Sequence, residues 1–292
     1  MSETTEWTIG RLLEWTADYL KQHGSETPRL DAEVLLARVR QCERIMLYTA
    51  FAEPASEEVR TEYRSLVKRR AEGAPVAYLV GYREFYSLDF DVSPAVLIPR
   101  PETEFLVIGT LDLIQEQGQK DKPLRIIDVG TGSGIVAICL AKNLPHAEIT
   151  AVDVSPDALA IAQQNARKHD VADRITFLES DVFANVPSGM FDYVVSNPPY
   201  IPIGELPDIQ KDVREFEPHV ALFSGDDGCD VIRRLISEST ERLEPNGFLL
   251  FEISDELNHP VQKLIDAAPN LKYQKTIKDL AGHARTVVAK RG

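Results

Sequence analysis

The residues with the clearest chemical potential stand in a row: Asn197, Pro198, Pro199 and Tyr200. Two consecutive prolines stiffen the backbone and remove two N–H donors, which leaves carbonyl oxygens unpaired and pointing outward. Asn197 adds a side-chain carbonyl as an acceptor, and Tyr200 adds an aromatic face. Two acceptors for two hydrogens, with a ring for stacking, suit a planar group that carries an NH₂. The alternative interpretation is a rigid turn at the end of a strand.

Such a site has a chemical use. The nitrogen of an amide or an aromatic amine is a weak nucleophile because its lone pair is delocalised. Two acceptors that hold its hydrogens favour the pyramidal form as the nitrogen attacks. This stabilises the transition state and requires no general base of matched pKa. A sulfonium methyl donor is already a strong electrophile, so alignment and this polarisation should suffice for methyl transfer.

A glycine-rich turn near the middle of the chain has the pattern of a ligand loop. It consists of Gly130, Thr131, Gly132, Ser133 and Gly134. The turn lies between a predicted strand and a predicted helix, so a ligand could approach backbone N–H groups at a helix N-terminus. Its GxGxG spacing differs from the GxGxxG of dinucleotide loops and the GxxxxGK[ST] of phosphate loops. The alternative interpretation is a tight strand-to-helix turn without a ligand.

An acidic residue, Asp153, ends the next predicted strand and lies 23 residues beyond Gly130. A carboxylate there can accept hydrogen bonds from both ribose hydroxyls of an adenosine. NAD and S-adenosylmethionine both carry an adenosine, so Asp153 does not distinguish between them. NAD would place a pyrophosphate at the glycine loop, whereas S-adenosylmethionine would place its amino-acid part nearby. The Asn-Pro-Pro-Tyr chemistry favours S-adenosylmethionine.

Strand and helix patterns alternate beyond Pro123, which predicts an α/β fold with a doubly wound parallel sheet. The predicted strands cover residues 124–129, 148–153, 175–178, 193–196 and 247–253. The predicted helices cover residues 103–117, 135–144, 156–169, 228–243 and 256–268. Two last strand-like runs, 271–278 and 285–289, have no helix between them, which suggests an antiparallel edge. Residues 197–227 show little regular pattern and are predicted to form a substrate-contacting flap.

The first part of the chain follows helical spacing instead. One apolar stripe ends at Gly24, a second runs from Leu30 to Val39, and a third helix is expected to start at the N-cap candidate Ser56. Apolar and polar residues then alternate between Tyr82 and Val92, which predicts a hairpin. We therefore expect a helical domain at residues 1–75, a hairpin linker at 76–100 and an α/β domain at 101–292.

Composition excludes several classes of protein. The formal net charge of −14 disfavours broad binding of nucleic acid, which requires a basic face. No apolar run approaches the roughly 20 residues of a membrane span, and the N-terminus lacks the pattern of a signal peptide. The three cysteines and six histidines are scattered, so neither a disulfide scaffold nor a metal site is indicated. A cytoplasmic protein is expected.

Several motifs together resemble the HemK/PrmC family of protein-glutamine N5-methyltransferases, which modify peptide chain release factors. The resemblance covers nearly the whole chain, and its most distinctive segment is Ile98-Pro99-Arg100-Pro101-Glu102-Thr103-Glu104. It also includes the stretches 75–85, 216–218 and 279–282, the glycine loop and the Asn-Pro-Pro-Tyr motif. It implies a seven-stranded class I S-adenosylmethionine-dependent methyltransferase domain, joined through a hairpin to a small N-terminal helical domain.

The same resemblance implies roles for individual residues. The glycine loop would face the methionine part of S-adenosylmethionine, and Asp153 would face its ribose. Asp181 and Val182 would lie alongside the adenine. The family commonly has an aromatic residue at the position of Val182, and the neighbouring Phe183 could compensate. Residues 197–200 would hold the glutamine amide of a Gly-Gly-Gln tripeptide in a release factor, with Asn197 also near the cofactor. Residues 1–75 are expected to contact the body of that substrate.

Three other functions remain open at this point. A glutamine methyltransferase that acts on a ribosomal protein would share the same motifs. An N6-adenine or N4-cytosine methyltransferase would act on an exocyclic amine with the same planar NH₂ geometry. Such enzymes, however, hold a flipped base and normally carry a basic surface. A non-catalytic S-adenosylmethionine-binding module is opposed by the intact Asn197 and Tyr200.

Overall fold

The computed structural model describes residues 6–292, and they form two compact units. The first contains the described residues up to Tyr82 together with residues 210–216, and the second contains residues 83–209 and 217–292. These limits differ from the predicted ones at 75 and 100. The difference arises because an unpredicted short helix extends the first unit and because residues 210–216 pack with it.

The first unit is helical, as predicted. Its helices are α1 (Ile9–Gln22), α2 (Pro28–Arg40), α3 (Arg44–Thr49), α4 (Glu57–Ala71), α5 (Val76–Val80) and α9 (Lys211–Phe216). Gly24, the predicted end of the first helix, follows α1 with a φ of +85°. The Ser56 hydroxyl caps α4 by accepting a hydrogen bond from the Val59 N–H at 3.3 Å. Leu13, Leu35 and other fully buried apolar side chains form its core.

A hairpin opens the second unit. It consists of β1 (Tyr82–Phe85) and β2 (Leu88–Asp91), as the alternating pattern predicted. Tyr86 and Ser87 turn the chain with φ angles of 51° and 59°. The Asp91 N–H donates to the side-chain oxygen of Asn165 at 2.7 Å, which fastens the hairpin to a helix of the same unit.

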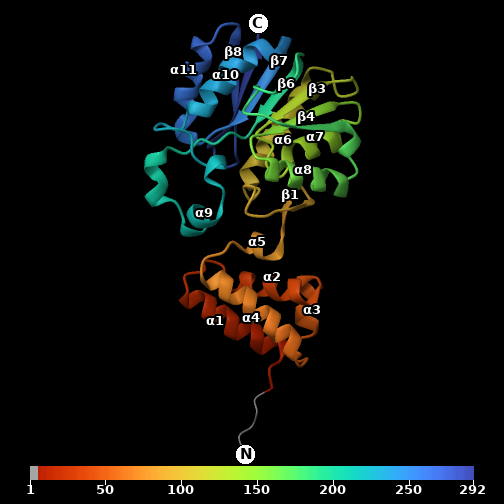
Figure 1. The fold of residues 1–292 in the computed structure, drawn as a ribbon, viewed down its shortest axis with the longest axis vertical. Helices are drawn as coiled ribbons and strands as arrows, with labels where there is room; N and C mark the ends of the chain where they lie inside the picture. Colours follow the sequence, from red (N-terminus) through yellow and green to blue (C-terminus); the bar gives the residue numbers. More distant parts are fainter. Residues whose placement is uncertain (1–5) are drawn as a thin grey trace, which may run out of the picture. The chain divides into compact units, whose positions relative to one another are not determined.

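The main sheet has seven strands in the order β5-β4-β3-β6-β7-β9-β8 (Figure 1). The strands are β3 (Arg125–Val129), β4 (Glu148–Asp153), β5 (Ile175–Glu179), β6 (Phe191–Ser196), β7 (Leu243–Glu252), β8 (Leu271–Lys278) and β9 (Ala284–Arg291). The first five named pair in parallel, whereas β9 pairs antiparallel with both β7 and β8. The predicted mostly parallel sheet with an antiparallel edge is therefore confirmed.

Helices cover both faces of this sheet (Figure 1). They are α6 (Glu104–Glu116), α7 (Ile135–Asn143), α8 (Pro156–Lys168), α10 (Asp230–Arg242) and α11 (Asn258–Ala267). One core cluster joins α6, α7 and α8 to the sheet, and a second joins α10 and α11 to its other face. Neighbours such as Ile126 and Ile127 enter different clusters because successive strand residues point to opposite faces.

The region between β6 and α10 is less irregular than its sequence suggested. Besides α9 it contains the short 3-10 helices Ile203–Asp208 and His219–Ala221, and an isolated bridge joins Ile201 to Phe223. Such short helices are too brief to produce a periodic apolar pattern. The remaining 3-10 turns are Pro101–Thr103, Ala172–Arg174 and Asp255–Leu257. Within residues 6–292, every helix is too short or too polar to span a membrane.

Candidate active site

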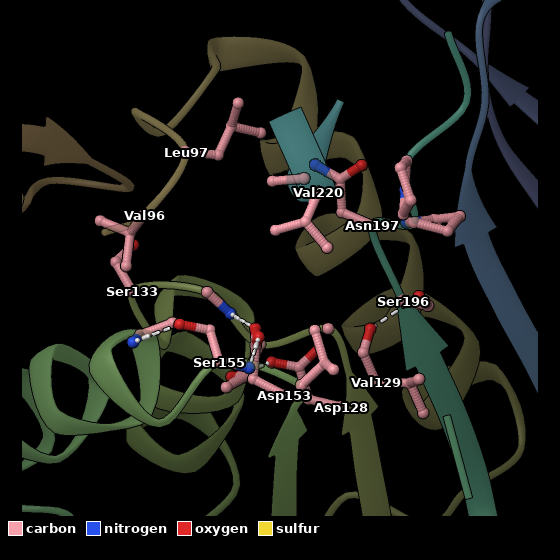
Figure 2. Close-up of a pocket in the computed structure, with 18 of the residues that line it drawn as sticks. Val96, Leu97, Asp128, Val129, Ser133, Asp153, Ser155, Ser196, Asn197 and Val220 are labelled. Carbon is pink, nitrogen blue, oxygen red and sulfur yellow. Dashed lines mark hydrogen bonds between the residues drawn. The ribbon is translucent and has the colours of Figure 1, made fainter. Parts of the chain in front are cut away.

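The carboxyl ends of β3, β4 and β6 border a cavity of about 330 Å³ (Figure 2). This is the edge at which open α/β sheets bind ligands. Figure 2 shows Asn197 and Val220 on one side of the hollow, Val96 and Leu97 on the other, and Asp153 at its base. A β-carbon at Gly130 would lie 3.9 Å from the backbone oxygen of Asn197, so the glycine loop and the Asn-Pro-Pro segment are neighbours.

Most of the sequence-predicted site residues line this cavity. Those that line it are Gly130, Thr131, Gly132, Ser133, Asp153, Asp181, Val182, Asn197, Pro198 and Pro199. Two predicted site residues, Gly134 and Tyr200, are not among the lining residues. Predicted residues up to 69 positions apart in the chain therefore meet in one place.

The glycine loop is held by backbone and carboxylate groups. The N–H groups of Gly130 and Thr131 both donate to the carbonyl of Val152, at 2.8 and 2.9 Å. The Gly132 N–H donates to Oδ2 of Asp153 at 2.8 Å. Gly130 and Gly132 have φ angles of 73° and 55°, a region that side chains disfavour. A β-carbon at Gly132 would meet nothing within 4 Å, so this glycine is required by the turn of the backbone.

Gly134, predicted as a cofactor contact, has a packing role. Its φ is 84°, and a β-carbon there would lie 3.0 Å from Ile138 and 3.2 Å from Ala162. The absence of a side chain lets α7 and α8 approach each other closely at the start of α7. This is the role that the third glycine has in dinucleotide loops.

Asp128 is a pocket residue that sequence reasoning did not assign. Its Oδ2 accepts hydrogen bonds from the Thr131 hydroxyl at 2.7 Å and from the Ala137 N–H at 3.2 Å. Its Oδ1 is buried and has no hydrogen-bond partner. Burial raises the pKa of this carboxyl to about 7, against the opposing effect of those two donors. The signal in the sequence was an acid inside an otherwise apolar strand, directly before the glycine loop.

Asp153 ends β4 and lines the cavity as predicted. Its Oδ1 accepts a hydrogen bond from the Ser155 N–H at 2.9 Å, and its Oδ2 accepts the one from Gly132. Burial raises the pKa of Asp153, while these backbone donors oppose the rise. Each carboxylate oxygen can accept more than one hydrogen bond, so both can still receive a ligand hydroxyl.

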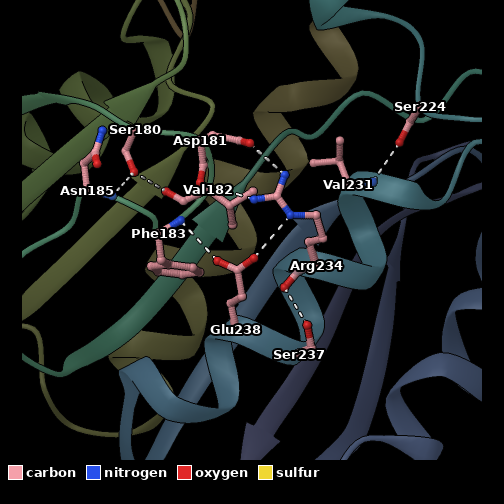
Figure 3. A network of polar contacts seen from close by, with 10 residues as sticks. All are labelled: Ser180, Asp181, Val182, Phe183, Asn185, Ser224, Val231, Arg234, Ser237 and Glu238. Carbon is pink, nitrogen blue, oxygen red and sulfur yellow. Dashed lines mark hydrogen bonds and ion pairs between the residues drawn. The ribbon is translucent and has the colours of Figure 1, made fainter.

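The segment after β5 forms the next part of the wall (Figure 3). Val182 is buried and has a φ of 53°, an outlier for a β-branched residue. Its carbonyl accepts a hydrogen bond from the Ser180 hydroxyl at 3.0 Å, and that hydroxyl accepts one from the Asn185 N–H. Phe183 is buried in the core cluster with α10 and does not line the cavity. Phe183, which was expected to compensate for Val182, thus lies in the core.

Arg234 on α10 fixes the position of Asp181. Its Nη1 donates to both carboxylate oxygens of Asp181, at 2.8 and 2.9 Å, and its Nε donates to Glu238 at 3.3 Å (Figure 3). The carbonyl of Asp181 accepts a further bond from Arg234 at 3.4 Å. The wall at Asp181 and Val182 is thus held from the side of α10.

Asn197 follows β6 directly. Its Nδ2 donates to the hydroxyl of Thr103 at 3.1 Å, which leaves Oδ1 as the acceptor of the amide. One residue earlier, the Ser196 hydroxyl donates to the carbonyl of Val129 at 2.7 Å and ties β6 to β3. Pro198 and Pro199 continue the wall of the cavity.

Tyr200, predicted to stack on the substrate, is not among the residues that line the cavity. Its hydroxyl donates to Oε1 of Glu252 at 3.1 Å, and its ring packs against the core cluster that contains α10 and α11. Burial raises the pKa of Tyr200, and the neighbouring Glu252 raises it further. The apolar surfaces that face the cavity come from Leu97 and Val220 instead.

Residues 95–103 form another part of the wall. The sequence pointed to this segment only through its resemblance to a family motif. Leu97, Pro99, Arg100 and Thr103 line the cavity. The buried carboxylate of Glu217 holds this segment by accepting hydrogen bonds from the Ile98 N–H at 3.1 Å and from Arg100 Nη2 at 2.5 Å. Glu217 stands two residues before the short helix His219–Ala221, which also reaches the cavity.

Glu252 is a buried acid beside the site, with an exposed fraction of 2%. Burial raises its pKa from 4.5 to about 7, although the Thr103 and Tyr200 hydroxyls oppose the rise. In the unfolded chain the proton is lost near pH 4.5, whereas the folded chain retains it up to about pH 7. The folded state therefore binds more protons in this window, and the free energy of unfolding must fall as the pH rises through it.

We expect this loss of stability to amount to about 3 kcal/mol, since each pKa unit corresponds to 1.36 kcal/mol. The measurement is urea unfolding of the whole protein from pH 5 to pH 8. Glu252→Gln, which cannot ionise, should remove this part of the slope and leave the part due to Asp128, which has the same sign. An equally steep slope in the Gln variant would contradict the assignment to Glu252.

Among residues 6–292, no group of three or more His, Cys, Asp or Glu side chains is arranged to hold a metal ion.

Two family models match the chain. Residues 11–81 match the PrmC N-terminal domain, and residues 107–208 match the methyltransferase small domain. The first match lies within the helical unit, and the second spans the glycine loop and the Asn-Pro-Pro-Tyr motif.

Curated relatives match almost end to end. The chain is 48% identical over 285 residues to the release factor glutamine methyltransferase of Rhodopirellula baltica, covering 97% of this chain and 96% of the relative. It is 42% identical over 256 residues to the enzyme of the same name from Geobacter sulfurreducens, covering 87% of each. Among solved structures, the T. thermophilus 16S rRNA N2 G1207 methyltransferase in complex with AdoMet and guanosine has a TM-score of 0.50 at 18% identity, covering 72% of this chain and 50% of that one. This last likeness concerns the fold, a class I methyltransferase fold.

Proposed function

Because the chain belongs to the family of release factor glutamine methyltransferases, we propose that it methylates a glutamine side chain of a peptide chain release factor. The methyl group would come from S-adenosylmethionine and go to the amide nitrogen N5 of the Gly-Gly-Gln glutamine. One observation carries the proposal: the cavity joins the glycine loop and Asp153 to Asn197, whose amide nitrogen donates to Thr103.

The residues present fit S-adenosylmethionine. Gly132 leaves open space at the turn, and Asp153 offers two carboxylate oxygens of the kind that a ribose diol needs. The relative in complex with AdoMet has the same fold, which supports this choice of cofactor. Val182 gives an apolar surface for the adenine, at the wall that Arg234 and Asp181 stabilise. When bound, the cofactor supplies an electrophilic methyl group on a positively charged sulfur.

The chain's own contribution is to hold and polarise the amide. Oδ1 of Asn197 is available to accept one hydrogen of the glutamine NH₂, and the carbonyl of Pro198 is the second candidate acceptor. With both hydrogens held, the nitrogen becomes pyramidal as it forms the bond to the methyl carbon. The bound cofactor would supply the methyl group, with the electron pair of the carbon–sulfur bond left on sulfur, and the amide nitrogen would release one proton to water. The products are N5-methylglutamine and the demethylated cofactor.

The direct test is mass spectrometry of a purified release factor before and after incubation with the enzyme and S-adenosylmethionine. The proposal predicts a gain of one CH₂ unit on the Gly-Gly-Gln glutamine. A gain on a ribosomal protein, with none on the release factor, would support the alternative glutamine methyltransferase. The net charge of −14 disfavours the DNA methyltransferase alternative, and a cytoplasmic location follows from a substrate that acts on the ribosome.

The helical unit carries the exposed apolar side chains that a protein substrate could cover. Ile45 and Met46 on α3 have exposed fractions of 63% and 51%. A single glutamine gives little affinity, so a second contact would raise it by effective concentration. We expect Ile45→Glu together with Met46→Glu to raise KM for the whole release factor about tenfold, within the range of interface truncations.

Steady-state kinetics on two substrates checks this second contact. The same variant should methylate a short Gly-Gly-Gln peptide as the unchanged enzyme does. Ile108→Glu, which alters an apolar side chain on α6 with an exposed fraction of 39%, is the control and should leave both KM values unchanged. Equal losses on protein and peptide would mean that the helical unit supports the fold and not the partner.

A further inference from the structure

We propose that Glu217 is a positioning residue that sets the width of a slot between Leu97 and Val220, through which a glutamine side chain reaches Asn197. This inference rests on the proposed function, because it names the part of the cavity that selects the acceptor side chain. It concerns two segments of the second unit, residues 95–103 and residues 218–221, which both contribute to the lining of the cavity.

Neither segment belongs to the main sheet. Residues 95–100 form no helix or strand, and residues 218–221 contain only the short 3-10 helix His219–Ala221. The hydrogen bonds of a strand ladder therefore do not fix the distance between them. Such connecting segments are the more mobile parts of a domain, so a side chain that joins two of them can set the shape of the cavity that they border.

The carboxylate of Glu217 joins the two segments. Its Oε2 accepts a hydrogen bond from the Ile98 N–H at 3.1 Å, and its Oε1 accepts one from Arg100 Nη2 at 2.5 Å. Glu217 is buried, so water competes little for either oxygen. Two charge-assisted hydrogen bonds to separate donors fix direction as well as distance. Because Pro218 follows directly, the start of residues 218–221 is held against residues 98–100.

The other end of the short helix is fastened as well. The Ile201 N–H donates to the carbonyl of Leu222 at 2.9 Å, and the Ser224 N–H donates to the carbonyl of Ile201 at 3.0 Å. These bonds tie residues 222–224 to the residue that follows the Asn-Pro-Pro-Tyr motif. Val220 thus lies between two fixed points, and the contact at Glu217 determines how far it stands from residues 97–100.

Leu97 and Val220 give the slot its apolar faces. Figure 2 shows Leu97 on one side of the hollow, and Val220 on the other side together with Asn197. Val220 is exposed although it is apolar. A glutamine side chain has two methylene groups before its amide, and covering them with apolar surface is favourable. An asparagine has one methylene group fewer, so it would lose either this cover or the contact of its NH₂ with Asn197.

The test measures how the full-length enzyme discriminates between two short peptides. A Gly-Gly-Gln peptide is the substrate and a Gly-Gly-Asn peptide is the competitor, so the ratio of the competitor's Ki to the substrate's KM measures discrimination whether or not the competitor is methylated. Glu217→Gln keeps the shape of the side chain and loses the charge and one acceptor oxygen. Arg100→Gln breaks the same ion pair at a partly exposed residue. Asp31→Asn is the matched control, since Asp31 is a buried carboxylate outside the cavity that pairs with Arg70 at 2.7 Å.

The unchanged enzyme should discriminate by at least tenfold, the scale of one methylene group in an apolar site. We expect Glu217→Gln and Arg100→Gln each to raise KM about tenfold, the scale of one lost hydrogen bond to a charged group, and to remove most of this discrimination. Neither KM nor Ki depends on the fraction of enzyme that is folded, so a loss of stability alone leaves their ratio unchanged. Asp31→Asn should lower the midpoint of thermal unfolding and leave the ratio as it is.

The double variant with Glu217→Gln and Arg100→Gln should be no worse than either single variant, because both changes act at one contact. An unchanged ratio in Glu217→Gln, or additive losses in the double variant, would overturn the proposal.

Hydrogen–deuterium exchange gives a readout that does not depend on turnover. The backbone N–H groups of residues 95–100 and of residues 219–224 should exchange faster in Glu217→Gln than in the unchanged enzyme, and Asp31→Asn should speed neither segment. Unaltered exchange in residues 219–224 would refute the joining role of Glu217. If the unchanged enzyme methylates neither a release factor nor a glutamine peptide, the proposed function fails, whereas the exchange result stands by itself.

Discussion

Asn197→Ala is expected to lower kcat by about 10²–10³, the range seen when one preorganised hydrogen-bonding group is removed from an active site. The reason is that the Asn197 oxygen acts mainly in the transition state, where the amide nitrogen loses its planarity. The affinity for S-adenosylmethionine should fall much less, because the glycine loop and Asp153 line a separate part of the cavity. Single-turnover kinetics and calorimetry on the same preparation measure the two quantities.

Asn143→Ala is the matched control for this variant. Asn143 ends α7, lies outside the cavity and donates only to a carbonyl of its own helix, so its loss should leave kcat unchanged. A general-base mechanism makes a different prediction: kcat would follow the titration of an acidic or histidine side chain, and Asn197 would matter little. Near-normal turnover in Asn197→Ala would therefore end the amide-holding interpretation.

Asp153→Ala should weaken the binding of S-adenosylmethionine by about 2–4 kcal/mol, which is the scale of two charge-assisted hydrogen bonds. The loss of the carboxylate also frees the N–H groups of Gly132 and Ser155, so the glycine loop becomes less ordered. Both effects act on the cofactor and not on the glutamine. Calorimetry with the free enzyme is the appropriate measurement.

Asp153→Asn is the milder variant. It keeps one acceptor oxygen, and it loses the charge, one of the two loop hydrogen bonds and one acceptor for the ribose, so its affinity should lie between those of Asp153→Ala and the unchanged enzyme. Equal affinity in all three proteins would contradict a ribose-binding role. Tighter binding of NAD than of S-adenosylmethionine by the unchanged enzyme would contradict the choice of cofactor.

The sheet could be predicted from the sequence because its signals are local. Each buried parallel strand is a short apolar run bounded by turn residues, and Ser155 and Pro156 mark the start of α8 as a capped helix does. The antiparallel edge could be predicted because no helix separates the last two strand-like runs, 271–278 and 285–289. Short helices such as α3 and α5 were not predicted, because five or six residues are too few to show a helical period.

The site was predictable only in part, because side-chain direction depends on packing that the sequence does not reveal. Tyr200 follows two prolines, and its type suggested stacking, yet its ring packs into the core and its hydroxyl reaches Glu252. Phe183 likewise enters the core between the sheet and α10. Gly134 belongs to the glycine motif by spacing but to the contact between α7 and α8 by position.

Partners that lie far apart in the sequence were the hardest to foresee. Glu217 is 117 residues from Arg100, and Glu252 is 52 residues from Tyr200. Neither acid stands at a spacing that points to its partner, and each becomes meaningful only when the sheet brings strand ends together. The resemblance to a family marked both Arg100 and Glu217 as notable without giving a reason, and the partly buried ion pair between them supplies that reason.

The helical unit is discontinuous in the chain, and this affects the order in which it forms during synthesis. Phe216 of α9 packs against its core, and Lys211 of α9 donates to the carbonyl of Glu72 at 3.4 Å. At about 5–20 residues per second, a ribosome needs roughly 6–25 s to travel from Tyr82 to Gln210. During that interval the apolar surface that later receives Phe216 is uncovered on the nascent chain. The unit that begins to fold first is therefore completed only after the glycine loop and the Asn-Pro-Pro-Tyr segment have been made.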